Sequence, residues 1–443
     1  MTVLLDTAPP SVYASAAAVL VRNWTGSSTV PSRTLYPHQW SWDSAFIAIG
    51  LRHLSVRRAQ RELESLLGAQ WGDGRVPHIV FNPSVPHTAY FPSPDFWRSS
   101  AAGAASGAPA GTETSGLVQP PVHALAAWLV HRADPAASER RGFLRRVYPR
   151  LVAWHSYLTG RRDLGGAGLT ANVHPWEPGM DNSPVWDGPL SRIEPVPAGS
   201  YRRADLDHGD PADRPTDLDY GRYVRLAADY RDRGYADDAH AFAVEDPGAN
   251  ALLIASEHAL AGIAAEVGAD PAPHRERAAR LTGALLERLW DARDGIFRCR
   301  DVISGEPIDE RGVAGLMPLL VPGLPAEVVG ALHATLTGPH FRLGELPLVP
   351  SYDLKGPAFD PSRYWRGPAW FNTAWVIERG LRQYGLLGDA DALRSAVVSG
   401  AVESRFAEYV DPFTGEGHGT RGFAWTAALA LDLAMTTVTA VTT

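Results

Sequence analysis

The sequence predicts an all-α protein folded as an (α/α)6 barrel, and three observations lead to this fold class. Apolar residues recur at helical spacing along most of the chain, and no segment sustains the strict alternation of a half-buried strand. The helical segments also fall into pairs joined by long connections rich in glycine, proline and aromatic residues. About twelve antiparallel helices without solenoid periodicity fit six hairpins closed into a ring. We expect one domain over residues 1–443, with long loops forming a lid over one end.

The individual elements follow from apolar periodicity. In the segment 281–290, Leu281, Leu285 and Leu289 recur at i, i+4 and i+8. In the segment 250–268 the apolar stripe ends before Gly268, which suits a helix cap. Comparable patterns predict further helices near 11–22, 43–53, 57–70, 121–133, 140–160, 217–233, 312–321, 325–336, 369–385, 388–409 and 424–438.

Two long irregular regions interrupt these helices, at about 82–118 and 176–216. Loops of this length are usually functional, so both are candidate rims or lids of a pocket. Within the first, the small-residue run 101–116 fits either a disordered surface loop or a mobile flap, and the sequence leaves both interpretations open.

Composition excludes several classes of function. The net charge of −8 gives no electrostatic footprint for nucleic acid or an anionic membrane. No run of about 18 apolar residues predicts a membrane span, and the first twenty residues lack the basic start of a signal peptide. Cys299 is the only cysteine and Lys355 the only lysine, which excludes an internal disulfide and most lysine chemistry. We therefore expect a cytoplasmic protein, and assembly into a homo-oligomer is left open.

Neither a metal nor a cofactor is expected. The 15 histidines show no H-E-x-x-H or similar ligand spacing. Glycine-rich phosphate loops in a strand–turn–helix context are also absent. The expected partner is a small molecule.

Tryptophan is the strongest compositional signal, with 14 residues in the chain. Large proteins bury aromatic residues in their cores, and that explanation competes here. Many of these rings nevertheless stand in loops beside polar residues, and a flat apolar face edged by polar groups suits a sugar ring. The loop tryptophans are Trp40, Trp42, Trp71, Trp97, Trp176, Trp186, Trp365 and Trp370.

The segment "HPWEPGMDNSPVWD" (174–187) holds three acids, Glu177, Asp181 and Asp187, between tryptophans and prolines and without a basic residue. A carboxyl group in apolar surroundings has a raised pKa, as a general acid requires at neutral pH. Glycoside hydrolysis needs a second carboxylate opposite the first. Sequence spacing leaves Asp43, Glu408 and Glu416 open for that role. The competing interpretation of a loop aspartate is a turn or cap residue.

Loop arginines are candidates for holding an anionic substrate group through paired hydrogen bonds. Arg214 lies in "DRPTDLDYGRY" together with Tyr220, and Arg366 lies in "YWRGPAW". The alternative is that each is a surface arginine without a partner. His78, in the loop "WGDGRVPHIVF", fits a sugar-hydroxyl ligand or an ordinary loop histidine.

Six motifs in order carry a resemblance to a known family: "YPHQWSWDSAF", "GDGRVPHIVF", "HPWEPGMDNSPVWD", "RPTDLDYGRY", "YWRGPAW" and "EYVDPFTGEGHG". Over about residues 33–435 the chain resembles the short bacterial members of glycoside hydrolase family 63, among them glucosylglycerate and mannosylglycerate hydrolases. The resemblance implies an (α/α)6 barrel and an inverting α-glycosidase. It also implies that Asp181 is the general acid and Glu408 the general base, with Glu416 in reserve.

The same resemblance implies the substrate-binding residues. Asp43 and Trp42 would hold the sugar, and Arg214 and Tyr220 the glycerate end. Further pocket positions are Tyr36, Trp40, His78, Gln119, Tyr364, Trp365, Gly367 and Trp370.

Three hypotheses compete. The first is hydrolysis of glucosylglycerate to glucose and glycerate, with mannosylglycerate as second substrate, and the charge of Arg214 favours it. The second is a glycosidase for a neutral α-glucoside, similar to a trehalase or an oligosaccharide-trimming enzyme. The third is a sugar epimerase or a sugar-binding helical barrel. Under the first two, inversion requires that the carboxyl groups of Asp181 and Glu408 stand about 6.5–9.5 Å apart.

Overall fold

The computed structural model describes residues 10–207 and 211–436. Five largely buried helices and one pair of 3-10 turns form a closed inner ring of six positions. The ring passes from α2 (Ser41–Leu51) to α5 (His123–Ala133) and α10 (Pro247–Val267). It continues through the 3-10 turns η8 (Val313–Gly315) and η9 (Met317–Leu320), α13 (Phe371–Gln383) and α15 (Ala424–Met435), which packs back onto α2. Every residue of α2 is buried, as expected of a helix that is apolar on all sides.

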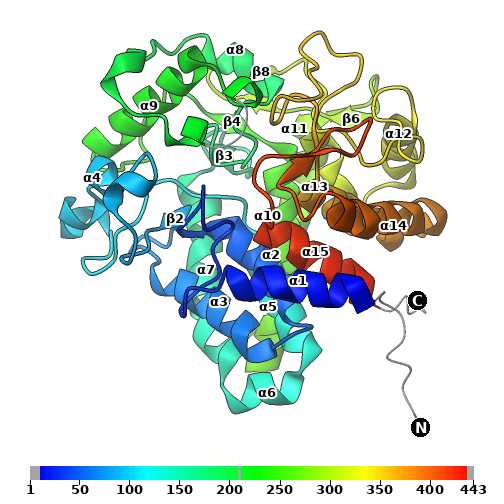
Figure 1. Ribbon diagram of the computed structural model, residues 1–443, viewed down its shortest axis with the longest axis horizontal. Helices are drawn as coiled ribbons and strands as arrows, with labels where there is room; N and C mark the ends of the chain where they lie inside the picture. The colour runs from blue at the N-terminus through cyan, green and yellow to red at the C-terminus, as the bar shows by residue number, and fades with distance from the viewer. Residues whose placement is uncertain (1–9, 208–210, 437–443) are drawn as a thin grey trace.

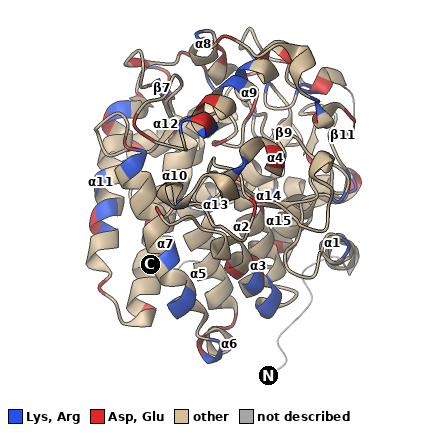
Figure 2. Cartoon of the chain, turned by 90° about the vertical axis from the view of Figure 1, so that its left-hand side faces the viewer, with Lys and Arg blue, Asp and Glu red and all other residues tan. Residues whose placement is uncertain are grey.

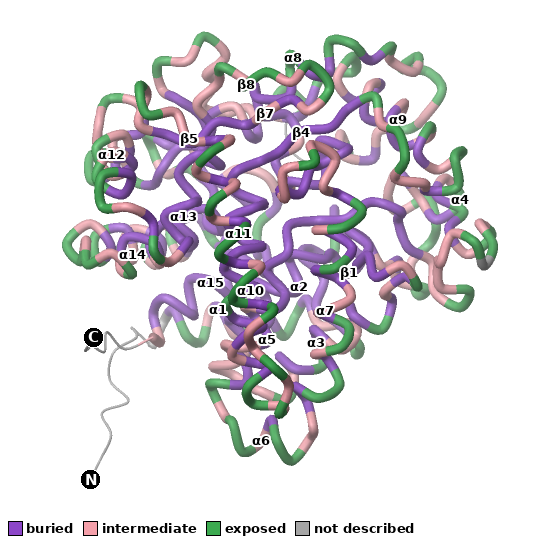
Figure 3. Tube along the Cα trace, turned by 180° about the vertical axis from the view of Figure 1, so that it is seen from behind, coloured by how far each residue is buried: buried purple, intermediate pink, exposed green. Residues whose placement is uncertain are grey.

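Amphipathic helices surround this ring. α3 (Val56–Gly68) packs on α2, α7 (Phe143–Arg161) and α11 (Ala272–Leu289) on α10, α14 (Leu387–Glu403) on α13, and α1 (Pro10–Arg22) on α15. α12 (Ala326–Thr337) follows η9 in the chain. Each outer helix turns its apolar stripe inward, so charge gathers on the outside, as along α11 (Figure 2), while the ring is buried (Figure 3). The (α/α)6 barrel is confirmed.

The helix α2 meets α15 at very short range. A Cβ atom on Gly50 would come within 2.3 Å of the carbonyl oxygen of Ala428, so no larger residue fits at this position. Figure 1 shows α1 and α2 in blue beside α15 in red, which closes the ring between the two ends of the described chain.

Very short strands join the loops at one end of the barrel. In the described residues every strand is two residues long, which agrees with the absence of alternating patterns in the sequence. β1 (Gln39–Trp40) pairs with β2 (Ile79–Val80), and β5 (Trp290–Asp291) pairs with β6 (Ile296–Phe297). β10 (Tyr409–Val410) lies between β9 (Ala369–Trp370) and β11 (Gly417–His418). The fourth sheet has the order β3 (Ala171–Asn172), β4 (Val244–Glu245), β7 (Arg300–Asp301) and β8 (Glu306–Pro307).

The two long irregular regions contain only short helices: α4 (Pro94–Trp97), α8 (Asp187–Leu190) and several 3-10 turns. Helix α9 (Asp217–Asp232), which follows the second region, packs against α4 and against η5 (Ala198–Ser200). The two regions are therefore linked to each other through α9. Closure as a lid, and mobility of the segment 101–116, stay predictions.

Two predicted helices differ from the structure. The segment 312–321 forms 3-10 turns, because Pro318 lacks the N–H that a continuing helix needs. The helix predicted over 388–409 ends at Glu403, since Arg405 and Phe406 have φ angles of +57° and +54°. Glu408 consequently lies beyond the helix, directly before β10. The residues predicted helical at 437–438 lie outside the described part.

Within the described ranges, no helix has both the length and the hydropathy to cross a membrane.

Candidate active site

A cavity opens at the end of the barrel where the short strands lie. Four inner helices present their N-terminal turns here, through Trp42 and Asp43 of α2, Gln119 before α5, Trp370 before α13 and Trp425 of α15. Lining residues predicted from the sequence are Tyr36, Trp40, Trp42, Asp43, His78, Gln119, Asp181, Arg214, Tyr220, Tyr364, Trp370 and Glu408. The structure thus gathers residues from almost the whole length of the chain around one space.

Glu408 is buried and accepts several hydrogen bonds in the cavity wall. Its Oε1 accepts from the hydroxyl groups of Tyr36 (2.9 Å) and Tyr364 (3.1 Å), and its Oε2 accepts from the backbone N–H of Thr420 (3.2 Å). A Cβ atom at Gly419, which has a φ of +66°, would lie 2.4 Å from Oε2. The carboxylate is therefore held in one orientation by groups on three segments.

Tyr364 reaches Glu408 from a backbone conformation that tyrosine rarely adopts, with a φ of +46°. Such strain persists only where surrounding contacts impose it, and it is common at functional sites. The Tyr364 ring packs on Trp370 and Tyr409. The backbone carbonyl oxygen of Tyr364 accepts a hydrogen bond from the indole N–H of Trp370 at 3.0 Å.

Arg214 enters the cavity from the second rim region and is buried. Its guanidinium donates to the hydroxyl of Tyr36 (3.2 Å), lies 4.9 Å from the centre of the Tyr364 ring, and stands 3.8 Å from Oε2 of Glu408. It is the one lysine or arginine among the lining residues of the described chain.

Asp181 faces the same cavity from the loop before η4 (Pro184–Trp186). Burial raises the pKa of its carboxyl group to about 7, and the negative charges of Glu408 and Asp205 act in the same direction. Its own backbone N–H and the positive charge of Arg214 act in the opposite direction. A carboxyl group with this pKa carries a proton for much of the time at neutral pH.

The other two acids of the segment 174–187 have different surroundings. Glu177 forms a buried two-pronged ion pair with Arg162, at 2.7 and 2.9 Å, and accepts from the backbone N–H of Val173 at 2.7 Å. Asp187 pairs with Arg366 at the rim. Of the three, only Asp181 lines the cavity, and Arg366 is not a lining residue either.

Asp43 is buried in the first turn of α2, and burial raises its pKa well above its ordinary value. His78 is likewise buried, and burial lowers its pKa well below its ordinary value; its Nδ1 lies 2.8 Å from the hydroxyl of Ser115. Gln119 accepts from the backbone N–H of Trp42 at 3.2 Å through Oε1. The hydroxyl of Tyr220 donates to the carbonyl oxygen of Phe91 at 3.1 Å.

Two predicted pocket residues are absent from the lining. Trp365 lies parallel to Trp370 with the ring centres 3.9 Å apart, so it supports a lining ring from behind. Gly367 packs against the backbone of Asp360 and makes room for that turn. The reserve candidate Glu416 is exposed on the β10–β11 hairpin and is not a lining residue.

The structure adds lining residues that sequence reasoning had not selected for the pocket: Pro31, Tyr90, Trp176, Gly179, Asp205, Pro215, Phe423 and Trp425. Trp176 and Gly179 belong to the segment of Asp181 and could have been found with it. Tyr90 and Asp205 come from the two rim regions, where no periodicity marks which side chains point inward.

The lining groups suit acid–base chemistry on a ring-shaped substrate, because carboxyl groups with raised pKa values, Asp43 and Asp181, share the cavity with Glu408 and with aromatic walls. The described residues contain no group of three or more His, Cys, Asp or Glu side chains placed to hold a metal ion.

Comparison with known proteins agrees with this chemistry. The model of the mannosylglycerate hydrolase MGH1-like glycoside hydrolase domain matches residues 36–426. A mannosylglycerate hydrolase of Rubrobacter radiotolerans is 42% identical over 96% of this chain and 97% of its own length. A glucosylglycerate hydrolase of Mycolicibacterium hassiacum is 38% identical over 96% of this chain and 98% of its own length.

A solved structure supports the same relationship. The crystal structure of the family 63 mannosylglycerate hydrolase from Thermus thermophilus in complex with Tris has a TM-score of 0.87 and 38% sequence identity to this protein. The match covers 95% of this chain and 99% of that one.

A helical barrel with carboxyl groups among aromatic rings in its cavity, in a chain similar over nearly its whole length to sugar-cleaving enzymes, defines a glycoside hydrolase. Within that class the chain belongs to the mannosylglycerate hydrolase MGH1-like family. The family resemblance seen in the six motifs is confirmed.

Proposed function

We propose that the protein is an inverting α-glycosidase that hydrolyses glucosylglycerate to glucose and glycerate, with mannosylglycerate as second substrate. Similar proteins bear both names, a glucosylglycerate hydrolase at 38% identity and a mannosylglycerate hydrolase at 42%. The observation that carries the proposal is Arg214, a buried cation in a cavity that otherwise suits a neutral sugar. A carboxylate on the aglycone is the natural partner of such a cation.

In the proposed reaction, Asp181 donates its proton to the glycosidic oxygen as the bond to the anomeric carbon breaks. A water molecule attacks that carbon from the opposite face, and Glu408 takes its proton. The products are the β-anomer of the sugar and glycerate. The raised pKa of Asp181 supports its role as acid, and the hydrogen bonds from Tyr36 and Tyr364 support Glu408 as a held base.

The remaining lining residues bind substrate in this proposal. Asp43, His78 and Gln119 supply polar groups for sugar hydroxyls, and Trp40, Trp42 and Trp370 supply the ring faces. Arg214 and Tyr220 hold the glycerate. Trp365 and Gly367 support the wall without touching the substrate.

An epimerase with histidine proton carriers has less support. His78 is the one histidine among the described lining residues, and burial keeps its pKa well below its ordinary value. A cytoplasmic location is part of the proposal, and its support is composition: one cysteine in 443 residues permits no internal disulfide.

The test is an assay of the purified protein on α-glucosylglycerate, α-mannosylglycerate and trehalose, followed by proton NMR. We expect the β-anomer of the sugar to appear first from a glycerate substrate. Intact glycerate substrates together with cleaved trehalose would instead select the neutral α-glucoside.

Variants assign the two carboxyl groups. We expect Asp181→Asn and Glu408→Gln each to lower kcat by on the order of 10³-fold, because each removes a proton transfer. Glu416→Gln is the matched control, an exposed acid on the neighbouring hairpin, and should retain full activity. A large loss in Glu416→Gln with activity kept in Glu408→Gln would reverse the assignment of the base.

A further inference from the structure

The position of Arg214 creates a conflict with the proposed reaction. Its guanidinium is 3.8 Å from Oε2 of Glu408 and donates to the Tyr36 hydroxyl, which itself donates to Oε1. A cation so placed stabilises the negative charge of Glu408 and so weakens it as a base. It also opposes the positive charge that develops on the sugar ring in the transition state.

Two other rim arginines, Arg203 and Arg366, have acids of their own. Arg203, on the same rim region, is held by Asp205 at 2.6 Å and by Asp217 at 3.0 Å. Arg366 is held by Asp187. For Arg214, the carboxylate within ion-pair distance among the described residues is that of Glu408. The negative charge with which Glu408 would accept a proton is therefore the same charge that neutralises Arg214.

A bound glycerate would remove the conflict. Its carboxylate can form paired hydrogen bonds with a guanidinium, which has five N–H donors and can keep its bond to Tyr36. The positive charge of Arg214 is then compensated by the substrate, and Glu408 is left to act on water.

We infer that Arg214 and Glu408 form a pair that the substrate itself separates: the aglycone carboxylate takes over Arg214 and so activates the base. The inference rests on the proposed function and deepens it. Arg214 then acts as a positioning and charge-control residue for Glu408 besides binding glycerate. Selectivity for an anionic aglycone would appear in kcat, and not only in KM, because the carboxylate stabilises the transition state more than the ground state.

The first experiment uses the unmodified enzyme and α-glucosyl fluoride, a substrate that fills the sugar position and leaves the aglycone position free. Water attacks the anomeric carbon, Glu408 accepts its proton, and the carbon–fluorine bond breaks with its electron pair leaving as fluoride. We expect added D-glycerate to increase the rate of fluoride release on the order of tenfold, and glycerol to have no such effect. An unchanged or lower rate with D-glycerate would overturn the inference.

The second experiment compares α-glucosylglycerate with α-glucosylglycerol, which has a hydroxymethyl group in place of the carboxylate. Arg214→Met should raise kcat on the glycerol substrate toward the value on the glycerate substrate, because Glu408 is then free of the arginine with either substrate, and it should raise KM for the glycerate substrate. Circular dichroism and thermal melting establish that the variant is folded. If it is not, the fluoride experiment on the unmodified enzyme decides.

The outcomes separate the two proposals. If the unmodified enzyme leaves α-glucosylglycerate intact, the proposed function fails. If it cleaves α-glucosylglycerate, but Arg214→Met changes only KM or lowers kcat on both substrates, the function stands and the inference fails.

Discussion

At the scale of single residues, the surroundings of each side chain distinguish the acids of the segment 174–187. Asp181 and Glu177 stand four positions apart in one apolar segment, yet Glu177 meets a buried arginine and Asp181 meets a cavity. Burial raises the pKa of Asp181 to about 7, whereas the carboxylate of Glu177 is held in an ion pair with Arg162. One segment therefore supplies both the proposed proton donor and a carboxylate that stabilises the fold.

The raised pKa predicts an alkaline limit on activity. As general acid, Asp181 must be protonated in the free enzyme, so kcat/KM should fall as pH rises through about 7. Well above that pH, the fall should approach tenfold per pH unit. The measurement is kcat/KM on α-glucosylglycerate between pH 5 and 9. A value that stays constant up to pH 9 would show that another group donates the proton.

Residue identities in the site were predicted where the sequence context is distinctive. Asp181 could be selected because tryptophans and prolines flank it, and Arg214 because it is a loop arginine in an acidic chain. Asp205 was missed because nothing in the sequence distinguishes it from its neighbour Asp207. Trp365 was predicted to line the pocket, but its stacking partner Trp370 lies between it and the cavity. The spacing of two tryptophans along the sequence does not indicate which of two stacked rings faces the cavity.

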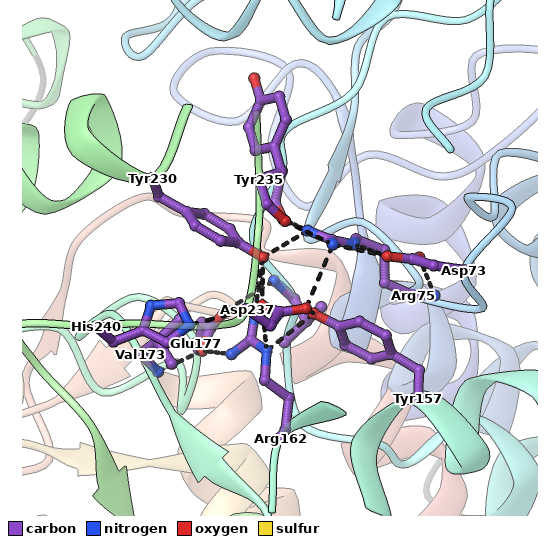
Figure 4. Close-up of polar contacts among 12 residues, drawn as sticks. Asp73, Arg75, Tyr157, Arg162, Val173, Glu177, Tyr230, Tyr235, Asp237 and His240 are labelled. Atoms are coloured by element: carbon purple, nitrogen blue, oxygen red, sulfur yellow. Dashed lines mark hydrogen bonds and ion pairs between the residues drawn. The ribbon is translucent and has the colours of Figure 1, made fainter. Parts of the chain in front are cut away.

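At the scale of elements, a network of buried charges fixes the segment that carries Asp181. Arg162, at the end of α7, holds Glu177 and also donates to the hydroxyl of Tyr157 at 2.9 Å. Asp237 accepts from the hydroxyls of Tyr157 (2.9 Å) and Tyr230 (2.7 Å), which connects α7 with α9 and the segment after it. Figure 4 shows these groups converging beside Val173 and Glu177.

The network predicts a large cost for losing its arginine. Arg162→Met leaves Glu177 buried without its counter-charge and should lower the free energy of unfolding by about 3–5 kcal/mol. The matched control is Arg225→Met on α9, whose ion pair with Asp229 is exposed, and it should change stability by less than about 1 kcal/mol. Chemical denaturation measures both. Equal effects would mean that the network contributes no more than a surface pair.

Element types were predicted well, and element ends were not. Apolar periodicity located these inner helices, because the extensive burial of α2, α10 and α15 leaves runs with little charge. The end of α14 depends on left-handed backbone angles at Arg405 and Phe406, residues that rarely adopt them. That turn, imposed by tertiary contacts, is what takes Glu408 out of the helix.

At the scale of the whole molecule, the barrel is closed by α2 and α15, so each inner element of the described chain packs between two others. We expect one cooperative thermal transition, with circular dichroism and tryptophan fluorescence giving the same midpoint, because removing one helix exposes two others. Scanning calorimetry should give a calorimetric enthalpy of unfolding equal to the van't Hoff enthalpy. Two resolved transitions would show that the chain divides into separate domains.

The close approach of Gly50 to Ala428 has a consequence for biosynthesis. The helix α2 is made early, but one of the surfaces that cover it belongs to α15, which is made after every other element of the ring. Until then the face of α2 that packs on α15 has no permanent cover, and joining the two helices requires contacts across nearly the whole length of the chain. We expect the native ring to close only after α15 has left the ribosome, which makes the nascent chain a natural client for molecular chaperones.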